Sequence, residues 1–414
     1  MTKKVEKRVP DIRFKGFTDD WEQRKLGEVL SKFDYGLNTA STNYDGQNKY
    51  LRITDIDDNS HLFLKDNLTS PSNLPINKKN YQLKKGDMVF ARTGASVGKT
   101  YKYLSEDGKV YFAGFLIRGR VKGKNDIGFV FNTTLQDSYK NFVKVMSIRS
   151  GQPGINSKEY QKHKIYVPKF NEQRELSNFI SKLDKAIALQ QKKLEQLKQF
   201  KKAMLQQSFP DKDGKLQIRF TGFTDAWEQR KLGDIATFSK GSGYSKADLK
   251  NSGTPVILYG RLYTNYELVI NSVNTFTSAK NNSVYSKGGE VIVPASGETA
   301  KDISIASVVN KPNFLLGGDL NIIHPSKNIK SVFLAVSISN GETKKDMARR
   351  AQGKSIVHLH NTDLSQIKLA YPSETEQKKI DSYFLKFDSL IALHQRKLDH
   401  LKLLKKFLLQ KMFI

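Results

Sequence analysis

Residues 93–100, with the sequence TGASVGKT, combine glycine, lysine and threonine in the manner of a phosphate-binding loop. Such a loop needs a glycine, four further residues and then Gly-Lys-Ser/Thr, because its backbone N–H groups must surround a phosphate at fixed spacing. Here three residues separate Gly94 from Gly98, and Thr93 stands where the first glycine is needed. Residues 101–117, which follow, are typical of strand rather than of the helix that a phosphate-binding loop opens. We therefore predict a loop between strands and no ATP hydrolysis by this chain.

Other clusters of chemically capable residues are weaker. There is no Asn/Asp-Pro-Pro-Tyr/Phe motif for amino-methylation and no cysteine, which excludes disulfides and cysteine-based zinc sites. The carboxylates and lysines of PDKDGK (210–215) are too tightly spaced for a nuclease, and HLH (358–360) lacks further metal ligands at suitable spacing. We expect no catalytic, cofactor or metal site.

The charge of the chain indicates a polyanionic partner. Its 414 residues carry a formal net charge of +28, from 69 Lys and Arg against 41 Asp and Glu. The basic residues are spread through sequence that is 38% hydrophobic and able to fold, which favours nucleic acid over the alternatives of a generally basic protein or a membrane-surface binder. No apolar run reaches the length of a membrane span or a signal peptide, so we expect a cytoplasmic protein and no membrane partner.

The chain contains an internal repeat. IRFKGFTDDWEQRKLGE begins at Ile12 and IRFTGFTDAWEQRKLGD begins at Ile218, which places the two tryptophans, Trp21 and Trp227, 206 residues apart. The likeness continues through FDYG (33–36) and FSKG (238–241), KKGDMVFARTG (84–94) and KGGEVIVPASG (287–297), and YVPKFNEQREL (166–176) and AYPSETEQKKI (370–380). Two similar units of about two hundred residues follow from this pattern. The loop TGASVGKT is not repeated, although a duplicated ATPase with one degenerate site is an alternative interpretation.

A long helix closes each half. Asn171 and Thr375 are the expected N-caps, with Glu172 and Glu376 favourably placed in the first turn. Apolar residues then recur in steps of four and three, which is the pattern of a coiled-coil seam, and its polar breaks include Lys201 and Lys405. The seam residues are Leu183, Ile187, Gln190, Leu194 and Leu197 in the first helix, and Phe387, Ile391, His394, Leu398 and Leu401 in the second.

The linker sets the direction of pairing. SFPDKDGK (208–215) spans at most about 29 Å, so the second globular unit must begin close to the end of the first helix. We therefore predict an antiparallel pair, with Gln190 opposite His394, Leu183 near Leu401 and Leu197 near Phe387. The predicted fold is α/β (α+β), with two similar globular domains, each followed by a long helix, related by an internal pseudo-two-fold repeat. The predicted boundaries are 1–170, 171–207 for the first helix, 208–215 for the linker, 216–372, and 373–414 for the second helix.

Together these features resemble the specificity subunit of type I restriction–modification systems. The resemblance rests on the two GFTD…WEQRKLG openings, the LKKGDMVFARTGASVGKT block and the two Glu-Gln helix starts, and it covers nearly the whole chain. It implies that each globular unit is a target recognition domain reading one part of a split site in double-stranded DNA. It also implies assembly with two modification (methyltransferase) subunits and with restriction subunits, which would hold AdoMet, ATP and Mg²⁺.

DNA-binding residues are expected in two places in each half, where Arg and Lys can reach guanine edges or phosphates and Gln can pair with adenine. The candidates are Arg92, Thr93, Ser96, Lys99, Arg149 and Gln152 in the first half, and Ser296, Lys301, Arg349, Arg350, Gln352 and Lys354 in the second. A nucleic-acid-acting enzyme with a degenerate nucleotide loop and a non-specific DNA-binding coiled-coil scaffold are the alternative functions.

Overall fold

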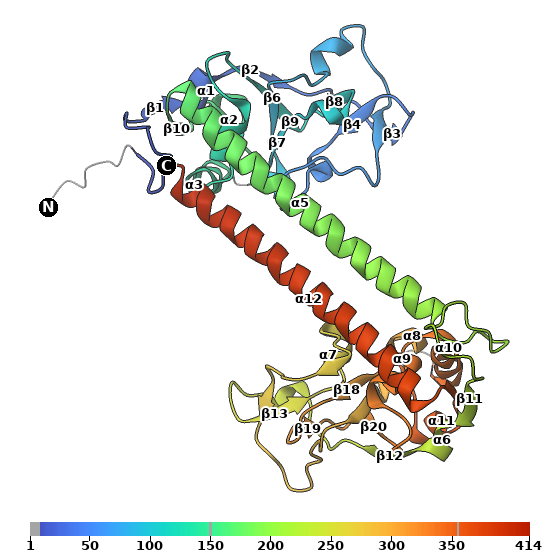
Figure 1. Cartoon of the computed structure of the whole chain (residues 1–414). Helices are drawn as coiled ribbons and strands as arrows, with labels where there is room; N and C mark the ends of the chain where they lie inside the picture. Colours follow the sequence, from blue (N-terminus) through green and yellow to red (C-terminus); the bar gives the residue numbers. More distant parts are fainter. Residues whose placement is uncertain (1–8, 149–150, 354–355) are drawn as a thin grey trace, which may run out of the picture. The chain divides into compact units, whose positions relative to one another are not determined.

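The structure is a computed structural model that describes residues 9–148, 151–353 and 356–414. The chain forms two compact units, the first containing the described residues up to Gln191 with Lys397–Ile414, and the second Lys192–Arg396 (Figure 1). Each unit thus combines one globular domain with a stretch of each long helix, α5 (Phe170–Gln207) and α12 (Glu374–Lys411). Within the described ranges, no helix is apolar over enough residues to cross a membrane.

The first domain is built on an antiparallel sheet in the order β2-β9-β6-β7. Its strands are β2 (Leu30–Tyr35), β9 (Leu116–Val121), β6 (Asp87–Ala91) and β7 (Thr100–Lys102). β6 is buried along its whole length, with Met88 and Phe90 in one apolar core and Val89 in another, because alternate side chains leave opposite faces of a sheet.

Shorter elements surround this sheet. The strand pairs are β3 (Ser41–Asn43) with β5 (Thr69–Pro71) and β4 (Lys49–Leu51) with β8 (Val110–Phe112), and the helices are α1 (Leu26–Val29), α2 (Ile127–Thr133), α3 (Asp137–Met146) and α4 (Ser157–Tyr160).

The second domain repeats this frame with a five-stranded sheet in the order β12-β20-β16-β18-β14. Its strands are β12 (Ala236–Lys240), β20 (Leu320–Pro325), β16 (Glu290–Pro294), β18 (Ser307–Val309) and β14 (Val269–Ile270). The other strands are β13 (Thr254–Ile257), β15 (Phe276–Thr277), β17 (Ser296–Gly297), β19 (Leu315–Leu316) and β21 (Val357–His358). The helices are α6 (Leu232–Ile235), α7 (Arg261–Thr264), α8 (Ala300–Ile303), α9 (Ser331–Ile338), α10 (Gly341–Arg350) and α11 (Asn361–Ser365).

The glycines of FDYG and FSKG occupy the same place in the two domains. A Cβ added at Gly36 would lie 2.1 Å from the Ala113 carbonyl oxygen, and one added at Gly241 would lie 1.9 Å from the Gly317 carbonyl oxygen. Both positions therefore need glycine because a neighbouring turn approaches the backbone too closely for any side chain.

The repeated openings pair with the strands that precede the long helices. β1 (Glu22–Lys25) pairs with β10 (Lys164–Val167), and β11 (Glu228–Lys231) pairs with β22 (Lys368–Tyr371) in the equivalent antiparallel register. The EQRK sequence thus closes each domain directly before its helix begins.

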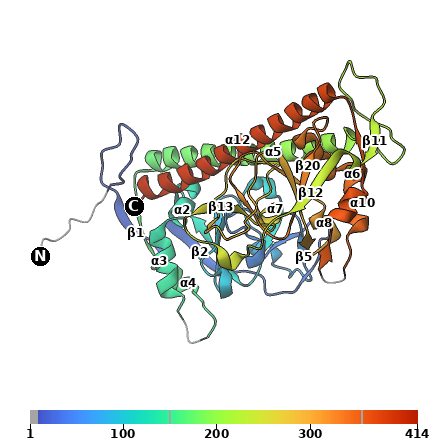
Figure 2. The same cartoon turned by 90° about the horizontal axis from the view of Figure 1, so that it is seen from below.

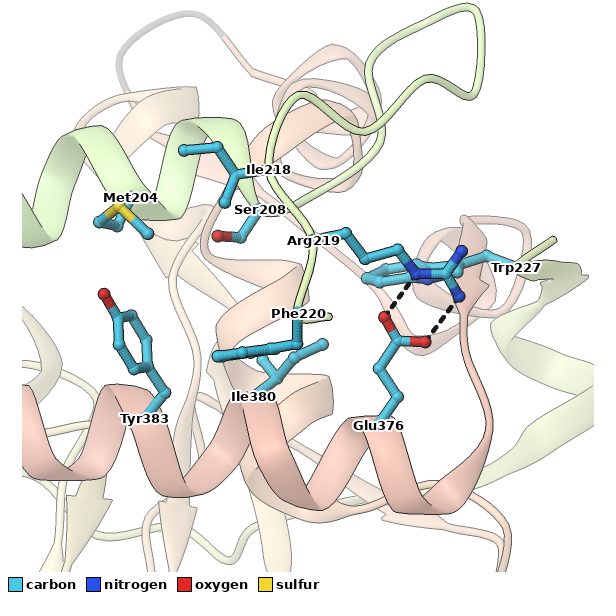
Figure 3. A pocket seen from close by; sticks show the side chains of 9 residues that line it. All are labelled: Met204, Ser208, Ile218, Arg219, Phe220, Trp227, Glu376, Ile380 and Tyr383. Carbon is cyan, nitrogen blue, oxygen red and sulfur yellow. Dashed lines mark hydrogen bonds and ion pairs between the residues drawn. The ribbon is translucent and has the colours of Figure 1, made fainter. Parts of the chain in front are cut away.

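A buried ion pair joins each opening to its helix. The Arg13 guanidinium donates to both carboxylate oxygens of Glu172 at 2.7 and 2.8 Å, and Arg219 donates to Glu376 at 2.8 Å twice (Figure 3). Each glutamate side chain is 2% exposed. The predicted interaction of the glutamates with the helix start is therefore accompanied by a bidentate arginine contact, which explains the arginine in both openings.

The glutamine that follows each glutamate connects the helix to the preceding domain. Gln173 donates from Nε2 to the Pro168 carbonyl oxygen and accepts from the Asp126 N–H, both at 2.9 Å. The same pattern recurs at Gln377, whose amide oxygen accepts from the Lys330 N–H at 2.8 Å. Both glutamines are buried and hydrogen-bonded on both sides of the amide, as burial of this polar group requires.

The predicted N-caps are wrong by two residues. Asn171 and Thr375 lie inside helices that begin at Phe170 and Glu374. At α12 the cap is Ser373, whose hydroxyl accepts from the Glu376 N–H at 3.4 Å. The helices begin earlier because the glutamate and glutamine must lie one full turn inside to reach their partners.

Each unit pairs the two long helices in opposite directions, as predicted. In the first unit, Leu176 and Ile180 near the start of α5 share a core with Leu409 near the end of α12. In the second unit, Met204 near the end of α5 packs with Ile380 near the start of α12. The end of the chain returns to the first unit, where the Lys411 carbonyl accepts from the Ile12 N–H at 2.8 Å (Figures 1 and 2).

The lysines that interrupt the heptad pattern form equivalent ion pairs. Lys405 contacts Asp184 at 2.6 Å in the first unit, and Lys201 contacts Asp388 in the second. Each pair joins α5 to α12, and both lysine side chains are less than one-fifth exposed. The polar breaks are therefore matched charges across the helix pair.

One ring contact between the long helices lies next to a predicted seam pair. Phe387, predicted beside Leu197, has its ring centroid 5.6 Å from that of Phe200, almost one turn further along α5. Gln190 and His394 belong to different units, so their proximity stays a prediction.

One carboxyl in the second unit is held in an unfavourable place. Asp381 on α12 has a buried Oδ1 without a hydrogen-bond partner among the described residues. Burial raises its pKa to about 7, against the opposing effect of the positive charge of Lys330. The equivalent residue of α5 is Ser177, so this carboxyl is not required by the shared frame.

We expect Asp381→Ser to raise the melting temperature of the second unit, with a gain that grows between about pH 4 and pH 7. The unfolded carboxyl ionises near its ordinary pKa of 3.8, whereas the folded one stays protonated to about pH 7. Wild-type stability therefore falls as pH rises through this window and the loss is complete above it. Thermal unfolding at stepped pH tests this, with Asp66→Ser as a control at an exposed aspartate; a gain independent of pH would contradict it.

We also expect Arg219→Met to lower the unfolding free energy of the second unit by about 3 kcal/mol, because it leaves a buried Glu376 carboxylate without its partner. The control is Arg230→Met, which removes an exposed contact with Glu228 at 3.7 Å and should cost less than about 1 kcal/mol. Urea unfolding measures both; equal losses would show that the buried pair has no special weight.

Candidate nucleic-acid interface

The glycine-rich segment of the first domain joins two strands of the central sheet, as predicted. β6 and β7 pair antiparallel with Phe90 opposite Thr100, and a 3-10 turn over Gly94–Ser96 lies between them. Gly94 and Gly98 have φ of +70° and +85°, which glycine adopts without strain. No helix follows the loop, so it lacks the helix N-terminus on which a phosphate-binding loop depends.

Lys99 is already engaged within the domain. Its ammonium lies 2.5 Å from an Asp58 carboxylate oxygen and donates to the Ile56 carbonyl at 3.3 Å. The lysine side chain is 19% exposed and the Asp58 side chain 75% exposed. Phosphate binding by Lys99 would require this accessible ion pair to be exchanged, whereas Thr93 and Ser96 lie half-buried on the turn itself.

The structure brings the two candidate segments of the first half together. Thr93 bridges Gly154, the Gly94 N–H donates to the Pro153 carbonyl at 3.0 Å, and the side-chain amide of Gln152 lies over Gly94. Gln152 is exposed. The segments therefore form one surface, although Arg149 lies outside the described residues.

The second domain has an equivalent junction. Ser296 in β17 pairs with His358 in β21, and His358 in turn exchanges two backbone hydrogen bonds with Gln352 at 2.7 and 3.0 Å. The Ser296 carbonyl also accepts from the Tyr263 hydroxyl at 2.7 Å. Lys301 is exposed on α8, and Lys354 lies outside the described residues.

The two candidate arginines of α10 differ in their freedom. Arg350 contacts Asp346 at 3.3 Å and donates to the Gln366 carbonyl at 3.3 Å. Arg349 has a Glu342 contact of 3.8 Å and donates to the Lys345 carbonyl at 3.2 Å, but its side chain is 67% exposed against 34% for Arg350. Arg349 is thus the better placed of the two to meet a ligand in solution.

Sequence reasoning missed the aromatic surroundings of Arg92. Its guanidinium carbon lies 4.9 Å from the centroid of Tyr35 and 5.9 Å from that of Phe115, within the range of cation–π attraction. Hydrogen bonding with Ser157 lowers the pKa of Tyr35, and the charge of Arg92 adds to this effect. No local pattern connects positions 35, 92 and 115, because strand pairing alone brings them together.

Two basic groups lie behind the glycine-rich loop. Burial lowers the pKa of His61, whose Nδ1 lies 2.9 Å from the Thr100 carbonyl oxygen, and burial also lowers the pKa of Lys102.

In the described parts of the chain, no three His, Cys, Asp or Glu side chains gather as metal ligands. The described arrangement offers cations, amides and aromatic rings on strand ends and loops, which are suited to binding nucleic acid.

Comparisons with known proteins agree with this organisation. A family model described as the type I restriction modification DNA specificity domain matches residues 18–199 and again 224–403. The chain is 21% identical over 404 residues to the type I restriction enzyme MjaVIII specificity subunit of Methanocaldococcus jannaschii, covering 94% of this chain and 91% of that one.

Solved structures share the fold. The type I restriction–modification S subunit from M. genitalium has a TM-score of 0.62 at 15% identity, covering 98% of this chain and 99% of that one. A chain from a structural study of complex assembly and conformational transition in a type I R-M system has a TM-score of 0.58 at 14% identity, covering 95% and 97%.

We expect the purified chain to release no phosphate from ATP in the presence of Mg²⁺, because the loop is one residue short and opens no helix. Lys99→Ala should behave in the same way. A sensitive phosphate-release assay measures both proteins, and activity that this substitution abolishes would contradict the expectation.

Proposed function

Because the chain belongs to the family of type I restriction modification DNA specificity domains, we propose that it is the DNA-recognition subunit of a type I restriction–modification complex. The observation that carries this proposal is that the family model matches both halves of the chain. Each half therefore has its own reader of DNA, built on the same frame.

The proposed target is two different short sequences separated by a gap that is not read. Equivalent readers at the ends of long helices would meet the major groove on about the same face, on the order of one helical turn apart. The diverged loops TGASVGKT and SGETAKD support different base preferences, so the site need not be a palindrome.

Charge supports the same function. The net charge of +28 would neutralise DNA phosphates and release counterions, so binding should weaken steeply with salt. Exposed Arg349 is suited to such a contact, and Gln152 to an adenine edge.

We propose that the chain itself is not catalytic. Methyl transfer would belong to two modification subunits that bind AdoMet, and cleavage to restriction subunits that use ATP and Mg²⁺. Exposed leucines on α5 and α12 support partner binding, since Leu189 and Leu403 are 69% and 66% exposed.

A domain graft tests the proposal. Residues 1–165 are replaced by the equivalent unit of a relative with different specificity, both helices are kept, and methylated positions are mapped in cells that also express the modification subunit. One half of the site should change while the other half and the gap stay fixed, because each domain has its own core and reading surface.

The reciprocal graft of residues 216–372 is the matched control and should change the opposite half. If both halves change together in either graft, or if one continuous site is methylated, the modular account is wrong.

A further inference from the structure

The two domains place three side-chain positions on the same backbone frame. The Arg92 N–H donates to the Phe115 carbonyl at 3.0 Å, and the Ala295 N–H donates to the Asp319 carbonyl at 2.8 Å. A second contact repeats the match, since the Ile155 N–H donates to the Arg92 carbonyl at 2.9 Å and the Leu359 N–H donates to the Ala295 carbonyl at 3.0 Å. Arg92 is therefore equivalent to Ala295, and Phe115 to Asp319.

The third position is set by the close-approach glycines. The Gly36 N–H donates to the Leu116 carbonyl and the Gly241 N–H to the Leu320 carbonyl, both at 3.1 Å. The residues before these glycines, Tyr35 and Lys240, are therefore equivalent as well. Tyrosine, arginine and phenylalanine in one domain correspond to lysine, alanine and aspartate in the other.

Two of these three positions lie at the domain surface in both domains, whereas Arg92 is half-buried and Ala295 is buried. Tyr35 and Phe115 are 41% and 56% exposed, and Lys240 and Asp319 are also exposed. The backbone hydrogen bonds that hold these positions are conserved between the domains, so packing does not dictate the difference. A position where the frame is fixed and the chemistry varies is suited to determining specificity.

Arg92 is also unlike the other arginines of its domain. Residues 9–148 contain six arginines, and five form ion pairs with carboxylates: Arg13, Arg24, Arg52, Arg118 and Arg120. Among the described residues Arg92 has no such partner, and its Nε–H is buried without a hydrogen bond. A buried donor left unpaired costs free energy. Two aromatic rings, rather than a carboxylate, restrict the motion of the Arg92 guanidinium.

We propose that Arg92 reads a guanine in the part of the DNA site recognised by the first domain, with Tyr35 and Phe115 as positioning residues. The guanidinium would donate to O6 and N7 of the guanine in the major groove. Phe115 and Tyr35 hold the planar guanidinium, which reduces the rotamer freedom lost on binding. This inference rests on the proposed function and specifies the residue that reads a base.

The same reasoning assigns a different chemistry to the second domain. Asp319 accepts hydrogen bonds and is suited to the N4 amino group of cytosine, whereas Ala295 leaves space where Arg92 stands in the first domain. Asp319→Asn should therefore alter only the half of the site read by the second domain.

The test uses the full chain expressed with its modification subunit in cells without other DNA methylation. Methylated sites are mapped for wild type, Arg92→Ala and Arg92→Lys, and the domain graft identifies the half read by the first domain. Both variants should relax the preference for guanine at one position of that half by about tenfold or more, since lysine keeps the charge but loses the fork geometry. The other half and the gap should not change.

Matched controls separate base reading from other roles. Arg24→Ala and Arg24→Lys change an exposed arginine of the same domain and should leave the site unchanged. Phe115→Ala should weaken the preference for guanine at the same position as Arg92→Ala does. Phe115→Tyr keeps the aromatic ring and should keep the wild-type preference. Thermal unfolding of the purified chains establishes that each variant is folded.

Three results would overturn the inference. Arg92 variants could keep the wild-type preference at every position, or Arg92→Lys could match wild type while Arg92→Ala weakens methylation uniformly, as expected of a phosphate contact. If neither variant methylates DNA, the test is binding of the purified complex to DNA duplexes substituted at each position of the site. An unchanged preference for guanine in that assay would overturn the inference. A wild-type chain that directs methylation to no bipartite site would instead contradict the proposed function.

Discussion

The buried contact between the opening arginine and the first-turn glutamate of the long helix is the constraint on which each unit depends. Arg13 and Glu172, like Arg219 and Glu376, are far apart in sequence but meet in bidentate geometry. Removing two charges from water is unfavourable unless they are paired, so the contact requires both segments to be in place together. It fixes where the helix begins relative to the domain and so sets the direction in which the helix leaves it.

The adjacent glutamines extend this junction into the domain. Gln173 and Gln377 each connect the proline before the helix to the start of the helix that follows the central sheet. The orientation of each side-chain amide is fixed, because its buried nitrogen donor and its oxygen acceptor both have hydrogen-bond partners. Together with the paired strands β1–β10 and β11–β22, they make the end of each domain a rigid base, while the opposite strand ends carry loops that differ freely.

This division explains how one frame can support two readers. The backbone contacts around Arg92 recur around Ala295 at nearly the same distances, although the side chains share no chemistry. The neighbouring side chains Tyr35 and Phe115, like Lys240 and Asp319, are exposed, so substitutions there need not disturb the central strands, which are buried on both faces. Specificity can therefore change without loss of the fold. The lysine–aspartate pairs between α5 and α12 contribute to the same separation, because they join the helices without using any of these side chains.

The sequence by itself determined the repeat, the antiparallel helix pairs, the strand–loop–strand nature of residues 93–100 and the family. These depend on local periodicity, on spacing and on linker length, which the order of residues records directly. Only the tertiary structure decided that Lys99 pairs with Asp58, that Ser373 caps α12, and that Tyr35 and Phe115 enclose Arg92. Apart from the local Ser373 cap, these contacts join residues separated by tens of positions, and which side chains meet depends on strand register and turn geometry. The candidate DNA-binding residues were therefore predicted as segments, whereas their partners and freedom to bind depended on the folded domain.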